Sequence, residues 1–298
     1  MISVLIPVYN YNVKSLVEEL LSQFNSIAIE FEIICIDDAS SLYVEKNEKL
    51  SKLKNVDFIN LKNNIGRSKI RNLLAEKSNY DWLLFLDADV MPKTNTFIKN
   101  YTDCIREGVF NVFCGGICYE ESKPPNDRLL RWAYGKKREE ISLNTRKEYP
   151  YRYFLGANFL ISKNTFSTTK FNEQIIKYGY EDILFFNDLK NNDVKVNQLK
   201  NEVYHLGIEN TDVFLFKTRQ ALDNLKSLNS QGIITEKHIK ILRIYTRVKT
   251  YSIDWLFAML YKCFNGIFLY NLKGRYPSIF VFDIYKLTYF CNINRCRI

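Results

Sequence analysis

Residues 82–89 have the sequence WLLFLDAD, in which five apolar residues precede two aspartates that flank an alanine. A short, continuous apolar run is typical of a strand that is covered on both faces of a parallel sheet. Residues 2–8, 32–36 and 56–61 show similar runs, and residues 15–24 and 67–78 have apolar residues at helical spacing. This alternation of strands and helices predicts an α/β fold with a doubly wound sheet.

Acidic residues follow two of the predicted strands. Asp37 and Asp38 come after residues 32–36, and Asp87 and Asp89 come after residues 82–86. Ligands of open α/β sheets bind beyond the carboxyl ends of the strands, so we expect these carboxylates to face a nucleotide. An Asp-x-Asp pair can also hold a hard divalent cation. The alternative is that each acidic group caps a following helix or turn.

The chain changes character after the predicted sheet. Residues 120–150 are polar and predict a mobile excursion over the sheet edge, with a helix over 128–138. Residues 151–162 and 202–206 predict strands, and residues 181–190 predict a helix. The composition shifts near residue 216, which predicts a catalytic domain over 1–215 and a basic, aromatic-rich helical region over 216–298.

Positive charge is concentrated in this C-terminal region. It has 14 Lys and Arg, 4 Asp and Glu, and 15 aromatic residues, whereas the net charge of the whole chain is +9. Aromatic and basic residues together are typical of a helical cap packed on a domain, of contact with an anionic membrane surface, or of nucleic-acid binding. We expect packing or membrane contact, the latter through residues 254–270, and no nucleic-acid partner.

The sequence also bears on location. The seven cysteines lack the paired spacing of a zinc site and suit free thiols in a reducing compartment. The chain opens on a strand-like run without signal-peptide features, and Lys262, Asn265 and Asn271 interrupt the apolar stretch over 255–272. We therefore expect a cytoplasmic protein that is peripheral at the inner face of the plasma membrane if the C-terminal region contacts lipid.

Several motifs, taken in order, resemble those of the family 2 glycosyltransferases, which have the GT-A fold: a Rossmann-like mixed sheet flanked by helices. The similar segments, within residues 1–210, are ISVLIPVYN at 2–10, EIICIDDAS at 32–40, NIGRS at 64–68 with Arg71-Asn72, DAD at 87–89, GAN at 156–158, GYED at 179–182, and His205. Ala39 replaces the family's usual glycine, and Tyr180 stands where other aromatics or glycine are frequent; both bear on specificity.

The resemblance implies a role for each of these residues. Donor binding is expected of Pro7, Tyr9, Asp38, Asn64, Gly66, Arg67, Arg71 and Asp87, with Asp38 accepting from a uracil-like N–H. Arg71 has an open alternative as a helix-surface residue. Gly156, Ala157 and Asn158 correspond to an acceptor-side loop, Asp182 to the general base with Glu181 orienting a substrate, and Asp89 and His205 to the ligands of Mn²⁺ or Mg²⁺.

The implied activity is inverting, metal-dependent transfer of a hexosyl group from a nucleotide-sugar, with UDP expected, to a glycan or lipid-linked acceptor in polysaccharide biosynthesis. A haloacid-dehalogenase-type phosphatase normally has its Asp-x-Asp on the first strand, not the fourth. A nucleotidyltransferase would need a glycine-rich loop near the first strand, and residues 7–12 contain no glycine. A non-catalytic nucleotide-binding module remains an alternative, and it would not need Asp182 or His205.

Overall fold

The computed structural model describes residues 1–237 and 239–295, so positions 238 and 296–298 of the expected C-terminal region lie outside it. The chain forms two compact units. The sheet unit comprises Met1–Tyr119, Arg138–Ile176 and Glu181–Gly207. The helical unit comprises Glu120–Lys137, Lys177–Tyr180 and the chain from Ile208 onward.

A mixed seven-stranded sheet, with the order β3-β2-β1-β4-β8-β6-β9, forms the centre of the sheet unit. Its strands are β1 (Ile2–Val8), β2 (Phe31–Asp37), β3 (Val56–Asn60), β4 (Trp82–Leu86), β6 (Val112–Cys114), β8 (Asn158–Ser162) and β9 (Val196–Gln198). Strands β1 to β4 run parallel to one another, whereas β8 is antiparallel to both β4 and β6. The predicted mixed α/β sheet flanked by helices is confirmed.

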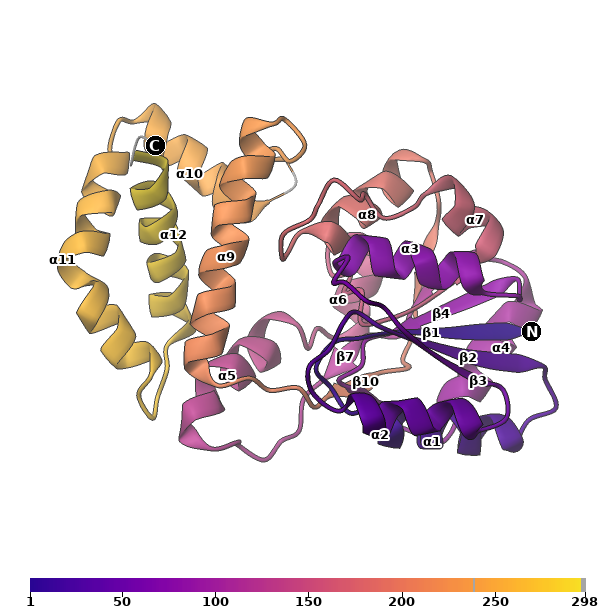
Figure 1. Cartoon of the computed structure of the whole chain (residues 1–298). Helices are drawn as coiled ribbons and strands as arrows, with labels where there is room; N and C mark the ends of the chain where they lie inside the picture. The colour runs from indigo at the N-terminus through magenta and orange to yellow at the C-terminus, as the bar shows by residue number, and fades with distance from the viewer. Residues whose placement is uncertain (238, 296–298) are drawn as a thin grey trace. The chain divides into compact units, whose positions relative to one another are not determined.

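Helices cover both faces of this sheet (Figure 1). Side chains alternate along β1, so Val4 and Ile6 pack in one apolar cluster and Leu5 packs in the other. The first cluster includes residues of α1 (Lys14–Asn25) and α4 (Phe97–Glu107). The second includes residues of α3 (Arg67–Lys77), α7 (Lys163–Thr168) and α8 (Glu181–Asn191). The remaining short helices of the unit are α2 (Val44–Glu48), η1 (Lys49–Lys52) and α6 (Leu143–Glu148).

A second, three-stranded sheet lies in the same unit, with the order β5-β10-β7. It consists of β5 (Val90–Pro92), β7 (Ile117–Cys118) and β10 (Val203–His205). Strand β10 is antiparallel to β5, with His205 opposite Val90, and parallel to β7. This pairing joins the segment that follows β4 to the late strand predicted over 202–206.

Two sequence-based expectations need correction. The strand predicted over 151–162 is confined to Asn158–Ser162, because residues 151–157 form turns beside α8. The polar segment 120–150 is largely helical, with η2 (Asn126–Arg128), α5 (Leu129–Arg138) and α6. Leu130 of α5 is buried in the apolar core of the helical unit, so burial anchors this part of the segment.

The helical unit is built from α5, α9 (Thr211–Ser230), α10 (Lys240–Thr250), α11 (Asp254–Leu272) and α12 (Ile279–Arg295). The predicted boundary between residues 215 and 216 falls inside α9, whose N-terminus is capped by Asn210. The side-chain oxygen of Asn210 accepts a hydrogen bond from Val213 N at 2.9 Å. The chain passes for the last time from the sheet unit to the helical unit after Gly207, just beyond β10.

Aromatic residues of the C-terminal region pack within the helical unit, and their packing on the catalytic domain, one of the alternatives considered, stays a prediction. Phe282 and Tyr285 of α12 form a core with Leu215, Leu272 and Ile279, and Tyr261 and Phe268 of α11 pack against it. The outer side of α11, however, stays exposed. No helix among the described residues combines the length and the apolar character that crossing a bilayer requires.

Candidate active site

The loops that follow β1 and β2 are tied to each other at the carboxyl end of the sheet. Asn10 adopts a positive φ of 52°, its backbone N donates to Ser40 Oγ at 2.7 Å, and its Oδ1 accepts from Ser41 N at 2.8 Å. Pro7, within β1, is partly buried, and Tyr9 is 57% exposed. The tied loops thus leave the ring of Tyr9 accessible at the edge where a base is expected.

Asp38 is buried and organises the next loop. Its Oδ1 accepts from Ile65 N at 2.7 Å and its Oδ2 from Gly66 N at 3.1 Å, while Asn64 Nδ2 donates to the backbone oxygen of Asp38 at 3.0 Å. Burial raises the pKa of Asp38, and the two backbone hydrogen bonds oppose that shift. Each carboxylate oxygen can accept a second hydrogen bond, so the role predicted for Asp38 toward a base is compatible with its structural one.

Two arginines at the start of α3 join two carboxylates. Arg71 Nη2 lies 2.7 Å from Asp87 Oδ1, and Arg67 Nη1 lies 3.0 Å from Glu181 Oε1. Longer contacts complete the network, Arg67 Nη2 to Asp87 Oδ2 at 3.9 Å and Arg71 Nη1 to Glu181 Oε1 at 3.8 Å. We call these four residues the arginine–carboxylate network. It joins the end of β4 to the N-terminus of α8.

The alternative of a surface position for Arg71 is excluded, because its side chain is only 1% exposed. Its guanidinium lies over the ring of Phe171, 5.4 Å from the ring centroid. The buried Nε and Nη1 atoms have no hydrogen-bond partner among the described residues, so they keep the capacity to donate to a ligand or a bound water. Burial alone would raise the pKa of Asp87, but Arg71 and Arg67 outweigh it and hold that pKa below its usual value.

Asp182 lies next to this network and is held by one oxygen. Its Oδ2 accepts from Gly156 N at 3.2 Å, while its buried Oδ1 has no hydrogen-bond partner among residues 1–237 and 239–295. Burial raises the pKa of Asp182 to about 6, with Arg71 opposing the shift and Glu181 adding to it. A Cβ at residue 156 would lie 2.3 Å from Asp182 Oδ1, so only glycine leaves room for this carboxylate.

Asp89 and His205 meet because β5 pairs with β10. Asp89 directly precedes β5, His205 is opposite Val90 in the ladder, and Leu206 N donates to the backbone oxygen of Asp89 at 2.8 Å. His205 Nε2 lies 3.5 Å from Asp89 Oδ2. Gly207 completes the turn, since a Cβ there would lie 2.2 Å from the same oxygen. The two predicted metal ligands are therefore adjacent.

The side chains of Asp89 and His205 suit a divalent cation that a diphosphate also binds. An imidazole and a carboxylate oxygen suit Mn²⁺, and the carboxylate also suits Mg²⁺. The described part of the chain has no group of three or more His, Cys, Asp and Glu side chains placed to hold a metal ion. Asp89 and His205 would thus supply two protein ligands, an arrangement that suits a cation binding together with a diphosphate rather than a permanently caged one.

The predicted acceptor-side loop is fixed by its own hydrogen bonds. Asn158 is buried, and its Nδ2 donates to the backbone oxygens of Gly116 and Asn201, each at 2.9 Å, while Tyr101 donates to its Oδ1 at 2.7 Å. Ala157 O accepts from Asp87 N at 3.2 Å. Asn158 therefore fixes the loop to the neighbouring backbone. Gly156 is the loop residue that hydrogen-bonds to Asp182.

Residues that the sequence analysis did not single out lie beside the metal pair. The ring of Tyr119 stacks on His205 with centroids 5.4 Å apart, Tyr119 N donates to Glu140 Oε2 at 3.0 Å, and the Tyr119 hydroxyl bonds to Glu139. Burial, followed by the charge of Asp89, raises the pKa of Tyr11. Tyr119 follows a two-residue strand, too short to give a sequence signal.

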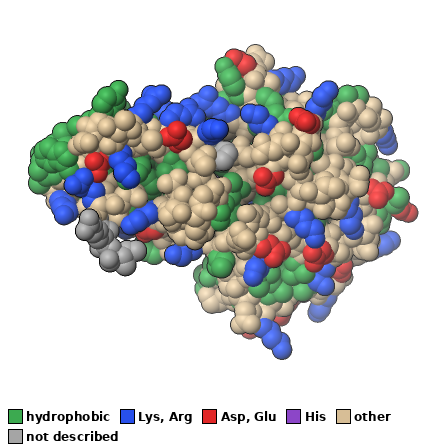
Figure 2. Space-filling view, turned by 90° about the horizontal axis from the view of Figure 1, so that it is seen from above, with side chains coloured by type: hydrophobic (Ala, Val, Ile, Leu, Met, Phe, Trp, Pro, Cys, Tyr) green, Lys and Arg blue, Asp and Glu red, His purple; other side chains and the backbone are tan. Residues whose placement is uncertain are grey.

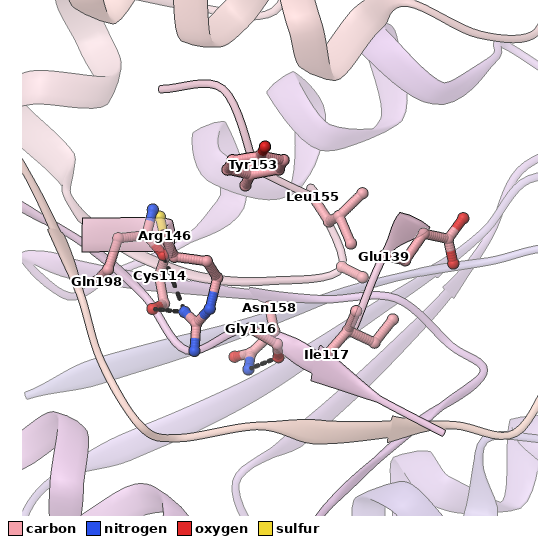
Figure 3. Close-up of a pocket in the computed structure, with 10 residues that line it drawn as sticks. Cys114, Gly116, Ile117, Glu139, Arg146, Tyr153, Leu155, Asn158 and Gln198 are labelled. Atoms are coloured by element: carbon pink, nitrogen blue, oxygen red, sulfur yellow. Dashed lines mark hydrogen bonds between the residues drawn. The ribbon is translucent and has the colours of Figure 1, made fainter. Parts of the chain in front are cut away.

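A small cavity lies beside this loop (Figure 3). Figure 3 shows Tyr153 and Leu155 on one side of it and Arg146, Gln198 and Asn158 on the other. Arg146 Nη1 donates to Gln198 Oε1 at 2.9 Å and to Cys114 O at 3.3 Å, so this second side is rigid and polar. Residues of the segment 110–160 thus contribute to both the cavity and the loop beside Asp182.

Comparisons with known proteins agree with this arrangement. The family described as "Glycosyl transferase family 2" matches residues 3–170, more than half of the chain. An uncharacterized glycosyltransferase of Haemophilus influenzae is 38% identical over 91 residues, which are 30% of this chain and 29% of that protein. The match therefore spans less than a third of that relative.

Solved structures of TarS from S. aureus share the fold. TarS 1–349 has a TM-score of 0.52 at 16% identity, covering 98% of this chain and 90% of that one. The same fragment in complex with UDP-GlcNAc has a TM-score of 0.50, also at 16% identity and with the same coverage. At this identity the likeness concerns the fold alone.

Proposed function

This chain belongs to glycosyl transferase family 2, and from that premise we propose that it transfers a hexosyl group from a UDP-sugar, with inversion, to a hydroxyl of a glycan or lipid-linked acceptor. The observation that carries the proposal is the position of Asp182, a carboxylate with a pKa of about 6, beside the arginine–carboxylate network at the carboxyl end of the sheet. TarS 1–349 in complex with UDP and with UDP-GlcNAc supports the choice of UDP.

The donor would lie over the carboxyl ends of β1, β2 and β4. Tyr9 and Asp38 would bind the base and ribose, and Arg67, whose side chain is 46% exposed, can reach a phosphate oxygen. The side chain of Arg71 is buried, so its main role would be to hold Asp87 and Glu181 in place. Its Nε and Nη1 atoms would remain able to donate to the bound donor or to a water. Fixing these carboxylates before the donor binds lowers the entropic cost of forming the site.

Asp182 would act as the general base. The acceptor hydroxyl would donate to Oδ1, the oxygen that has no partner within the described residues. As the acceptor oxygen bonds to the anomeric carbon, the bond from that carbon to the diphosphate oxygen breaks and the proton passes to Asp182. Attack from the face opposite the leaving group inverts the anomeric configuration.

Asp89 and His205 would hold Mn²⁺ or Mg²⁺, which when bound offsets the negative charge of the diphosphate leaving group. The chain itself prepares this by placing both side chains through the β5–β10 ladder. The stack of Tyr119 on His205 and the lack of space at Gly207 restrict the positions that the two ligands can adopt. Rigid support of this kind tunes metal affinity.

Binding of UDP is expected to depend on the metal and on Asp89. In a calorimetric titration with Mn²⁺, UDP should bind to the unaltered chain, and chelator or Asp89→Ala should weaken binding at least tenfold, as for loss of a metal ligand or its support. Asp81→Ala, a carboxylate before β4 at the opposite end of the strand, is the matched control. Metal-independent UDP binding would refute the assigned metal site, and binding of GDP alone would refute UDP.

Transfer is expected to increase with pH through the pKa of Asp182. The base must be deprotonated, so kcat/KM at pH 5 should be about tenfold below its plateau above pH 7, given a pKa of about 6. UDP release from a UDP-sugar, measured between pH 5 and 8 with UDP affinity followed in parallel, tests this. A profile that is flat from pH 5 upward would show that no group with this pKa limits the reaction.

A further inference from the structure

The outer face of α11 is apolar and exposed along its whole length. Trp255, Met259, Cys263 and Ile267 follow one another at four-residue spacing, and Tyr270 continues the row. Their exposure ranges from 45% for Met259 to 86% for Tyr270, and Cys263 is exposed as well. Five neighbouring positions on one helix face thus leave apolar surface in water, in excess of the scattered apolar residues of an ordinary surface.

The opposite face of α11 already provides the packing that the helical unit requires. Ala258 and Leu272 are buried, Tyr261 and Phe268 pack in the core with α12, and Asp254 is ion-paired with Arg295 at 2.7 Å. The outer row is therefore not needed for the core of this unit. Folding alone does not explain why these positions are apolar.

Basic residues predominate around this face, although the Nζ of Lys273 lies 2.5 Å from Oδ1 of Asp212. Residues 255–282 contain no Asp or Glu, whereas Lys262, Lys273 and Arg275 are exposed. Tyr276 and Phe280, just beyond α11, are 84% and 72% exposed. Figure 2 shows a gathering of hydrophobic side chains with several Lys and Arg and fewer Asp and Glu beside them. Aromatic and apolar residues bordered by cations are typical of helices that lie in the interface of an anionic membrane.

We propose that the outer face of α11, together with Tyr276 and Phe280, docks this chain on an anionic lipid bilayer, with α11 lying along the membrane surface. A second copy of the chain would fit less well, because pairing this face with itself would bring Lys262 and Arg275 of both copies together, and residues 255–282 contain no Asp or Glu to neutralise them. The proposal goes beyond the transfer reaction, which needs no membrane, and specifies the surface at which a lipid-linked acceptor would be met.

Vesicle co-sedimentation of the full chain tests this docking surface. Phosphatidylcholine vesicles that contain about one third phosphatidylglycerol should bind the unaltered chain. Vesicles of pure phosphatidylcholine should bind it at least tenfold more weakly. The double variant Met259→Glu with Ile267→Glu should bind at least tenfold more weakly. The double variant Lys262→Gln with Arg275→Gln should lose about fivefold in affinity for each positive charge that is removed. Val109→Glu, at a 71% exposed position of the sheet unit, should bind like the unaltered chain.

Tryptophan emission locates the contact. Trp255 is one of three tryptophans, so the blue shift on adding anionic vesicles should disappear in Trp255→Phe. Thermal unfolding and UDP titration of each variant separate loss of docking from loss of fold or of the donor site. Unchanged vesicle binding by Met259→Glu with Ile267→Glu would overturn the proposal. A stable dimer that these substitutions dissociate, without vesicle binding by the unaltered chain, would also overturn it.

Discussion

Asp182→Asn is expected to lower kcat at least about 10²-fold and to leave UDP affinity nearly unchanged. Asparagine preserves the size of the side chain and can still accept from Gly156 N, but it cannot take the proton of an acceptor hydroxyl. General base catalysis contributes about 10²–10⁴-fold, which sets the size of the effect. Release of UDP from the UDP-sugar that the unaltered chain turns over fastest measures kcat, and calorimetry measures UDP affinity.

Asp193→Asn is the matched control for this substitution. Asp193 is exposed just after α8 and has a φ of 56°, a conformation that asparagine adopts as readily as aspartate. It should keep full turnover. If Asp182→Asn also kept full turnover, the role of general base would be refuted. If the unaltered chain bound UDP but turned over no sugar nucleotide, the alternative of a non-catalytic nucleotide-binding module would be favoured.

Arg71→Met is expected to reduce the free energy of unfolding by about 3–5 kcal/mol, because it removes one partner of a buried ion pair. Methionine fills similar space but leaves Asp87 and the buried Glu181 without the cation that lies 2.7 Å and 3.8 Å from them. The two carboxylates then share Arg67, whose half-exposed side chain lies 3.0 Å from Glu181 and 3.9 Å from Asp87, in a poorly solvated site. Urea unfolding followed by circular dichroism measures the change.

Lys69→Met is the control, since Lys69 is an exposed cation on the same helix and its loss should change stability by less than about 0.5 kcal/mol. Combining Arg71→Met with Asp87→Asn should recover part of the lost stability, because the second substitution leaves Arg67 to compensate Glu181 alone. A loss below about 1 kcal/mol for Arg71→Met would show that the network does not depend on this guanidinium.

Much of the sheet was predictable from local patterns. The apolar runs of β1, β2, β3 and β4 match the structure to within a few residues, because both faces of parallel strands are buried, and so do the helices predicted over 15–24 and 67–78. The carboxylates at the ends of β2 and β4 could be placed together for the same reason, since parallel strands present their carboxyl ends at one edge. Roles for Glu181, Asp182 and His205 required the resemblance to a family.

Residues that act through distant contacts could not be predicted in this way. The burial of Arg71 depends on Phe171 and Asp87, and the adjacency of Asp89 and His205 depends on two three-residue strands with little sequence signal. Similarly, nothing local distinguishes the packed aromatics of α11 from the exposed ones until α12 covers one side.

The sequence by itself therefore determined the α/β class, the first four strands of the sheet, and the acidic groups at its carboxyl edge, because periodicity and apolar content are local properties. Only the tertiary structure decided which carboxylate is neutralised and which is left to accept a proton. Asp87 has two guanidiniums beside it and a lowered pKa, while Asp182 has one hydrogen bond and a pKa of about 6. That difference arises from burial and from charges far away in the chain, which no local pattern contains.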